Sequence, residues 1–117
     1  NNNDLIIISP TPVFPYNPVD LYGNGKVFGD KISISLKKWE DNKQNIKINK
    51  ILDYFKNKDI TVIDSTEIFC INLIKDECIA ANNNSIYYRD SHHLTIEGAE
   101  LIFLELDKIL QKKLKNE

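Results

Sequence analysis

Two short, continuous apolar runs constrain the fold of this chain most strongly. They are DLIIIS at residues 4–9 and DITVID at residues 59–64. Both have the length and the β-branched content of a buried strand, which is typical of a parallel sheet covered by helices. Because a helical pattern lies between them, the sequence predicts an α/β fold with a parallel sheet.

Two segments carry the spacing of amphipathic helices. Over residues 36–57, one apolar face recurs at i, i+3, i+4 and i+7. This face is formed by Ile48, Ile51, Leu52 and Phe55. Leu36 and Trp39 either belong to this helix or form a short turn before it. A second helix is predicted over about 96–115, with Thr95 as its N-cap. Its apolar stripe consists of Ala99, Ile102, Phe103, Leu106, Ile109, Leu110 and Leu114.

The remaining segments have no clear periodicity. Residues 10–30 contain all four prolines and three of the four glycines, which predicts a long irregular loop. Either Asp64 or Ser65 is suited to cap a short helix after the second strand. We expect an irregular segment from there to the turn at 82–84, followed by a short extended piece. Two substantial strands are too few for an independent sheet, so we expect the 117 residues to form a single, incomplete domain.

Composition and charge exclude several classes of protein. The formal net charge is −2 and the pI is about 5.7, so there is no basic excess for a nucleic-acid surface. No apolar run approaches the roughly 18–20 residues that a membrane span needs. The sequence opens with NNND and then the first strand, without the segments of a signal peptide. We therefore expect a fragment of a longer protein.

The two cysteines, Cys70 and Cys78, enclose the short segment INLIKDE. A disulfide between them would add about 2–3 kcal/mol of stability and would indicate an oxidising compartment. Two buried free thiols are the alternative. Two cysteines do not make a structural zinc site, which needs four ligands, and the histidines lie well further along the chain. We expect no metal and no cofactor.

The two histidines are adjacent, in the segment YRDSHHLTIEGA at residues 88–99. Asp90 and His93 stand three residues apart in a loop that leads into the last helix. In such a turn the aspartate can accept the Nδ1 proton of the histidine, which fixes the tautomer and leaves Nε2 free as a general base. His92 would point elsewhere and is the weaker candidate. Alternatively, Asp90 or Ser91 stabilises a turn and both histidines are ordinary surface residues.

The stretch over residues 64–102 resembles the C-terminal end of SGNH-type hydrolase domains, as attached to bacterial membrane acyltransferases that O-acetylate cell-surface sugars. In that family a strand ends in an aspartate, two cysteines follow, and a tyrosine-rich strand leads to Asp-x-x-His-Leu-Ser/Thr-x-x-Gly-Ala and a closing helix. The opening LIIISPTPVFP is similar to the family's strand and proline-containing loop. The matching residues are Asp64, Cys70, Cys78, Tyr87, Asp90, His93, Leu94, Thr95, Gly98 and Ala99.

This resemblance implies the back part of a flavodoxin-like three-layer sandwich with a parallel sheet. It implies that Asp90 is the orienting acid and His93 the base of a Ser-His-Asp triad, and that Cys70 and Cys78 form a structural disulfide. The implied reaction is ester hydrolysis or acyl transfer through an acyl-serine. An acetylated glycan or acyl donor is the implied substrate and a membrane acyltransferase domain the implied partner. The implied location is the extracytoplasmic face of a bacterial membrane.

One part of the family pattern is missing. The family's nucleophile lies in a Gly-Asp-Ser block after the first strand, whereas the nearest string here is Gly29-Asp30-Lys31. The glycine and asparagine of the family's oxyanion hole have no counterpart either. Ser9 precedes a proline, and Ser91 is too close to His93 in sequence to be activated by it. We therefore expect this chain to supply the Asp and His of the triad and to be inactive alone.

Other hypotheses predict different features of the structure. A non-catalytic carbohydrate-binding or interaction module would have a closed core and a His93 without a carboxylate partner. A Cys–His nucleophile pair would need a free thiol near His93. An enzyme fragment predicts an Asp90–His93 hydrogen bond and an open sheet edge, through which the chain could self-associate. Trp39, Tyr16 and Phe14 could line a sugar site, although lone aromatic residues more often belong to the core.

Overall fold

A pair of parallel strands runs through one half of the molecule. In the computed structural model, which describes residues 5–23, 31–41, 43–82 and 85–115, β1 (Ile6–Ile8) pairs with β3 (Thr61–Ile63). The register sets Ile7 opposite Val62. The predicted α/β class with a parallel sheet is therefore confirmed.

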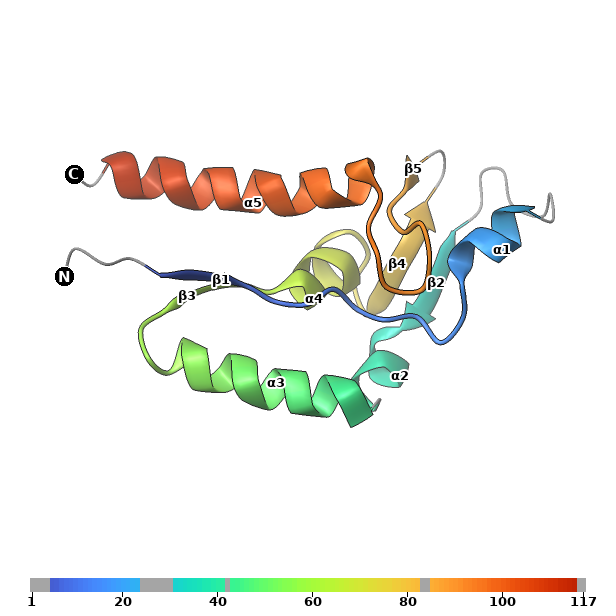
Figure 1. Ribbon diagram of the computed structural model, residues 1–117, viewed down its shortest axis with the longest axis horizontal. Helices are drawn as coiled ribbons and strands as arrows, with labels where there is room; N and C mark the ends of the chain where they lie inside the picture. Colours follow the sequence, from blue (N-terminus) through green and yellow to red (C-terminus); the bar gives the residue numbers. More distant parts are fainter. Residues whose placement is uncertain (1–4, 24–30, 42, 83–84, 116–117) are drawn as a thin grey trace.

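Helices lie on both sides of this strand pair. Helices α3 (Lys43–Lys56) and α5 (Ile96–Lys115) both contact β3 and run along opposite sides of it (Figure 1). This half of the molecule is thus a three-layer α/β/α arrangement, consistent with part of a flavodoxin-like fold. Helix α5 begins where the sequence predicts, because the Thr95 hydroxyl accepts the Gly98 N–H at 3.1 Å and so caps the first turn.

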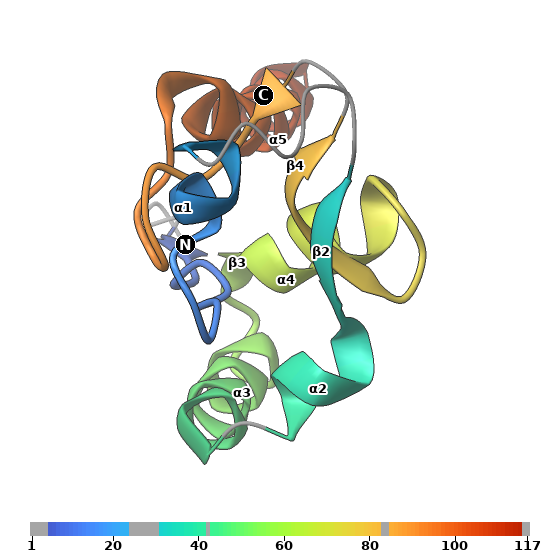
Figure 2. The ribbon, with the colours of Figure 1, turned by 90° about the vertical axis from the view of Figure 1, so that its right-hand side faces the viewer.

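A second sheet, which the sequence analysis does not predict, occupies the other half. It is antiparallel, with the strand order β2 (Ile32–Ser35), β4 (Glu77–Asn82), β5 (Ser85–Ile86). Figure 2 shows β2 and β4 side by side. Part of the segment expected to be irregular is therefore regular structure. Strand β4 is buried from Cys78 to Ala81 because it packs against η1 (Ile68–Asn72), a π-helical turn.

Three short helices complete the chain. Helix α1 (Pro18–Gly23) lies within the predicted long loop, so that loop is shorter than expected. Helix α2 (Leu36–Glu40) is separate from α3 and carries Trp39, which settles the alternative left open by the sequence. Helix α4 (Ser65–Glu67) is capped as predicted, since the Asp64 carboxylate accepts the Thr66 N–H at 3.0 Å.

The hydrophobic core sits between the antiparallel sheet, η1 and the loop that follows β1. Phe14, Trp39 and Tyr88 are all at most 3% exposed, and the Phe14 ring meets the Tyr88 ring edge-on at 4.8 Å between centroids. Phe14 and Trp39 therefore belong to the core, although Trp39 also helps to line a hollow of about 170 Å³ beside Val13 and Lys38. Of the three aromatic residues considered for a sugar site, only Tyr16 is exposed, at 36%.

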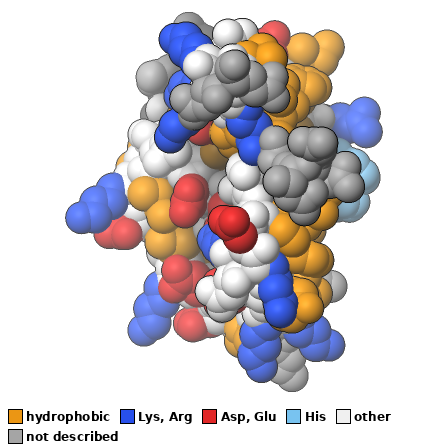
Figure 3. All heavy atoms as spheres, turned by 90° about the vertical axis from the view of Figure 1, so that its left-hand side faces the viewer, with side chains coloured by type: hydrophobic (Ala, Val, Ile, Leu, Met, Phe, Trp, Pro, Cys, Tyr) orange, Lys and Arg blue, Asp and Glu red, His pale blue; other side chains and the backbone are white. Residues whose placement is uncertain are grey.

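The parallel strands and their helices are less buried than the sequence suggests. Leu5 and Ile8 are 56% and 46% exposed, so the prediction of a strand buried on both faces is wrong for β1. The physical reason is that β1 pairs only with β3, and a two-stranded layer covers little surface. Positions of the predicted helical stripes are exposed for the same reason: Ile51, Phe103, Leu110 and Leu114. Hydrophobic side chains form several patches among charged side chains on this face of the molecule (Figure 3).

Candidate active site

The adjacent histidines lie in a tight loop between the antiparallel sheet and α5. Tyr88 and Leu94 form an antiparallel bridge, and the Arg89 N–H donates to the His93 carbonyl at 2.9 Å. These two contacts close residues 89–93 into a short turn. Because α5 starts directly after this turn, the capped first turn of the helix fixes one end of it.

Asp90 organises this turn through both of its carboxylate oxygens. Oδ1 accepts the backbone N–H of His92 at 2.9 Å and that of His93 at 2.6 Å. Oδ2 lies 2.7 Å from Nδ1 of His93. The structure therefore brings together the two residues that the sequence pairs, and the backbone contacts hold the carboxylate in place to receive the imidazole.

These contacts determine the charge state of the pair. The backbone N–H groups of His92 and His93, aided by the His93 ring, hold the pKa of Asp90 well below its usual range. A carboxylate can only accept a hydrogen bond, so this contact requires a proton on His93 Nδ1; in the neutral imidazole the lone pair is then on Nε2. The His93 side chain is 53% exposed. A neutral His93 in this tautomer can take a proton from a group that approaches Nε2.

His92 has a different environment from His93. Its Nδ1 lies 2.9 Å from the Ser91 hydroxyl and 3.7 Å from Oδ1 of Asp90. The two imidazole rings are tilted against each other with their centroids 4.0 Å apart. His92 thus shares the carboxylate of Asp90 at the longer distance, so the expectation that it points elsewhere is wrong.

The loop that follows β1 braces the histidine loop from below (Figures 1 and 2). The Phe14 N–H donates to the Ser91 carbonyl at 2.8 Å, and the Thr11 hydroxyl donates to the His92 carbonyl at 3.0 Å. The buried hydroxyl of Tyr88 donates to the Pro12 carbonyl at 2.7 Å. Sequence reasoning does not identify these positioning residues, because their partners lie more than 70 positions away along the chain.

Neither serine considered as a nucleophile is positioned to react with His93. Ser9 is 4% exposed, and its hydroxyl accepts the Ser65 N–H at 2.7 Å while donating to the Pro10 carbonyl at 3.2 Å. It joins the ends of β1 and β3. The Ser91 hydroxyl contacts His92. Of the string compared with the family's nucleophile block, Gly29 and Asp30 lie outside the described residues.

The structure contains the disulfide between Cys70 and Cys78. Both residues are fully buried, and the bond links η1 to β4. Because both sulfurs are bonded, neither can act as the thiolate of a Cys–His pair. That hypothesis is therefore wrong for this structure.

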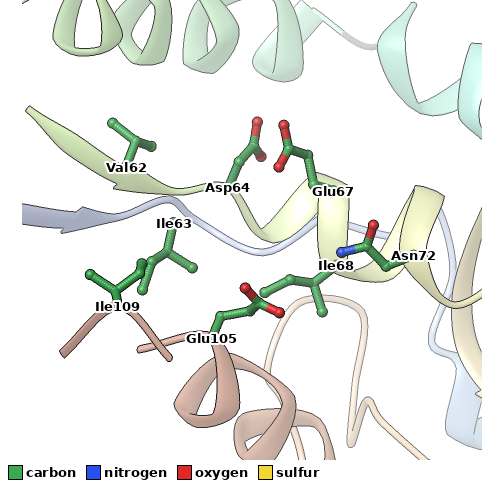
Figure 4. Close-up of a pocket in the computed structure, with 8 residues that line it drawn as sticks. All are labelled: Val62, Ile63, Asp64, Glu67, Ile68, Asn72, Glu105 and Ile109. Carbon is green, nitrogen blue, oxygen red and sulfur yellow. The ribbon is translucent and has the colours of Figure 1, made fainter. Parts of the chain in front are cut away.

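A separate hollow of about 70 Å³ lies between β3, α4 and α5. It is lined in part by the carboxylates of Asp64, Glu67 and Glu105, with Glu105 on the opposite side from the other two (Figure 4). Asp64 caps α4 and pairs with Lys56 at 3.2 Å, so its charge is already compensated. Neither Asp90 nor His93 lines this hollow, so it is separate from the histidine loop.

Comparisons with known proteins point in the same direction as the geometry. The family model described as the SGNH domain fused to AT3 domains matches residues 1–108. A search of curated proteins and a search of solved structures each found no match. Within the described residues, no helix is both long and apolar enough to cross a membrane.

Proposed function

The chain belongs to the family of SGNH domains fused to AT3 domains, and we propose that it supplies the acid–base pair of an ester-hydrolysing or O-acetyl-transferring site. In this proposal His93 is the general base and Asp90 the group that orients it. The single observation that supports it best is the 2.7 Å contact from Asp90 Oδ2 to His93 Nδ1, with Nε2 left open to an incoming group.

The proposed reaction uses Nε2 of His93 first as a base and then as an acid, while Nδ1 stays bonded to Asp90. Nε2 takes the proton of a serine hydroxyl as its oxygen attacks an ester carbonyl, and Asp90 stabilises the imidazolium that results. Nε2 then returns the proton to the departing sugar oxygen, which leaves an acyl-serine. Water or a second sugar hydroxyl resolves this intermediate with His93 again as the base, giving hydrolysis or transfer respectively.

The proposed site still lacks its nucleophile, because neither Ser9 nor Ser91 is positioned to react with His93. Ser9 is buried in the core and Ser91 contacts His92, so we propose that the nucleophile comes from a Gly-Asp-Ser block elsewhere in the native protein. A positioned base contributes about 10²–10⁴ in rate, but it has nothing to activate without this hydroxyl. The chain of 117 residues should therefore be inert toward esters on its own.

The family and the disulfide support the proposed location and partners. Fusion to AT3 domains, which are acyltransferases, supports a membrane acyltransferase domain as the covalent partner. The disulfide supports an oxidising compartment, and we propose the extracytoplasmic face of a bacterial membrane. The proposed substrates are an acetyl donor and a cell-surface glycan. A non-catalytic binding module fits less well, because it gives no reason for a charged hydrogen bond that fixes one tautomer of His93.

A covalent serine probe tests this proposal on the native protein. A fluorophosphonate should label one serine of that protein. The serine oxygen attacks the phosphorus of the probe, and this attack needs the same base as attack on an ester. Labelling should fall by at least about 10²-fold in His93→Ala and persist in Ser91→Ala. Labelling of the native protein that is unaffected by His93→Ala would contradict the proposed role of His93.

A further inference from the structure

We infer that the histidine loop is also a binding site for a zinc-like divalent cation, with Asp90, His92 and His93 as ligands. Each of the three residues offers one ligand atom, and these atoms all lie within 4.8 Å of one another. The two cysteines cannot be ligands, because they are bonded to each other. His92 has no part in the proposed triad, and a cation on its Nδ1 would replace the 2.9 Å contact of that nitrogen with the Ser91 hydroxyl.

The distances suit a cation of this size. Ligands at about 2.0–2.2 Å from a tetrahedral zinc ion lie roughly 3.3 Å apart. Oδ2 of Asp90 is 2.7 Å from Nδ1 of His93, and Oδ1 is 3.7 Å from Nδ1 of His92, so these two separations lie on either side of that value. Each of the two must change by only about half an ångström to match it, and all three ligand atoms lie within 4.8 Å of one another. Both histidine side chains are 53% exposed and can make such an adjustment.

The loop is also organised before a cation arrives. Oδ1 of Asp90 holds the backbone N–H groups of His92 and His93, and the loop after β1 holds the carbonyls of Ser91 and His92. A site whose backbone is already fixed loses less conformational entropy on binding. Two imidazoles and one carboxylate, with water completing the shell, form a ligand set that zinc accepts and that magnesium, which prefers oxygen ligands, does not.

Binding would exchange one contact for another within the proposed acid–base pair. Solvent carries the proton of His93 from Nδ1 to Nε2, the lone pair freed on Nδ1 binds the cation, and the Nδ1–H···Oδ2 hydrogen bond is replaced by two metal–ligand bonds. With a cation on Nδ1 and the proton on Nε2, the neutral His93 ring has no lone pair left to act as a base. This regulatory consequence rests on the proposed function, whereas binding itself does not.

Calorimetric titration of the 117-residue chain, without a purification tag, tests the site directly. Zinc chloride should bind with one ion per chain, and magnesium chloride should give no saturable heat. His92→Asn should weaken zinc binding by at least about tenfold, since it removes a ligand. Asp107→Asn, which removes an exposed carboxylate from α5, should bind zinc as the unchanged chain does. The backbone amide spectrum of His92→Asn checks that this exposed substitution leaves the fold intact.

Magnetic resonance of the histidine rings tests whether zinc binds at these three residues. On titration with zinc, the ring resonances of His92 and His93 should shift together and saturate at one equivalent. Zinc binding that is equally tight in His92→Asn, or no saturable binding at all, would overturn the inference. Neither readout involves an ester, so failure here leaves the proposed function standing, and an inert native protein leaves the metal site standing.

Discussion

At the scale of single residues, Asp90 lies in a surface loop but has two separate structural roles in the candidate site. One carboxylate oxygen fixes the turn through two backbone N–H groups while the other fixes the tautomer of His93. The spacing Asp-x-x-His is the only part of this arrangement that the sequence conveys. The second role, shaping the turn itself, follows from the side chain being short enough to reach the N–H groups two and three residues ahead.

The charge of Asp90 predicts how stability depends on pH. Its folded-state pKa is depressed, so it stabilises the fold above its unfolded-state pKa, about 3.9, and this contribution is lost as the pH falls below that value. In Asp90→Asn the contribution is absent. Urea unfolding at pH 7 and pH 3 should therefore show a difference between the two proteins that narrows at the lower pH. A difference of equal size at both would mean that the pKa of Asp90 is not depressed.

Gly98 is required by close packing at the start of α5. A Cβ atom at this position would collide with the Tyr87 carbonyl oxygen and crowd the Leu94 side chain. That carbonyl also accepts the Thr95 N–H at 2.9 Å, so it cannot move without loosening the cap. Gly98→Ala should destabilise the fold by about 1–3 kcal/mol in chemical denaturation. The neighbouring exposed substitution Glu100→Ala should change stability by less than about 0.5 kcal/mol; equal effects would contradict the packing argument.

At the scale of elements, the sequence predicts those that depend on local pattern and fails for those that depend on tertiary contacts. The runs at 4–9 and 59–64 and the stripe of α5 are long enough to show their period. Strand β4, ECIAAN, has little β-branched content and is a strand because β2 and η1 pack on it. Strand β2 is only four residues long and gives too few positions to establish an alternation.

The candidate site likewise has one part that local spacing predicts and one part that depends on tertiary contacts. Asp90 and His93 are three residues apart, so their pairing is a local event that spacing predicts. The bracing by Thr11 and Tyr88 joins segments that only the fold brings together, and no local pattern reports it. The best available signal is the pair of tyrosines in IYY, of which a buried one needs a partner for its hydroxyl.

The brace between the two loops can be tested at Tyr88. Tyr88→Phe removes one buried hydrogen bond and leaves the Pro12 carbonyl without its donor. We expect a loss of about 1–3 kcal/mol in unfolding free energy. Because the histidine loop would also be held less firmly, hydrogen exchange of the His93 amide should become faster. Tyr54→Phe, at an exposed tyrosine of α3, is the matched control. Unchanged exchange at His93 would mean that the brace does not position the site.

The disulfide also acts at the scale of elements, because it links η1 to β4 in the core. Replacing both Cys70 and Cys78 by alanine should lower the unfolding free energy by at least about 2–3 kcal/mol, the value expected for a short closed loop. Reduction of the unchanged chain should lower its thermal midpoint as well. A chain that is equally stable with and without reductant would show that the core does not depend on the bond.

At the scale of the whole molecule, many large apolar side chains of the described residues are exposed to solvent. Leu5 precedes β1 and Ile8 is its last residue, and both are exposed; Phe103, Leu110 and Leu114 lie exposed on α5. In the structure β1 pairs with β3 on one edge. Unpaired strand edges and contiguous apolar surface favour association. We expect the isolated chain to self-associate in sedimentation velocity experiments, and Ile8→Lys to reduce this association. Ile46→Lys, at an exposed isoleucine of α3, should not. Equal sedimentation of both variants would exclude the β1 edge as the contact.

The central claim is that Asp90 and His93 work as an acid–base pair on a serine supplied by the native protein. Hydrolysis of nitrophenyl acetate by that protein, measured for His93→Ala, Asp90→Asn and Ser91→Ala, tests it most directly. We predict a loss in kcat of about 10²–10⁴ for His93→Ala and of up to about 10⁴ for Asp90→Asn, with Ser91→Ala unchanged. Full activity in His93→Ala, or loss of activity in Ser91→Ala alone, would contradict the account.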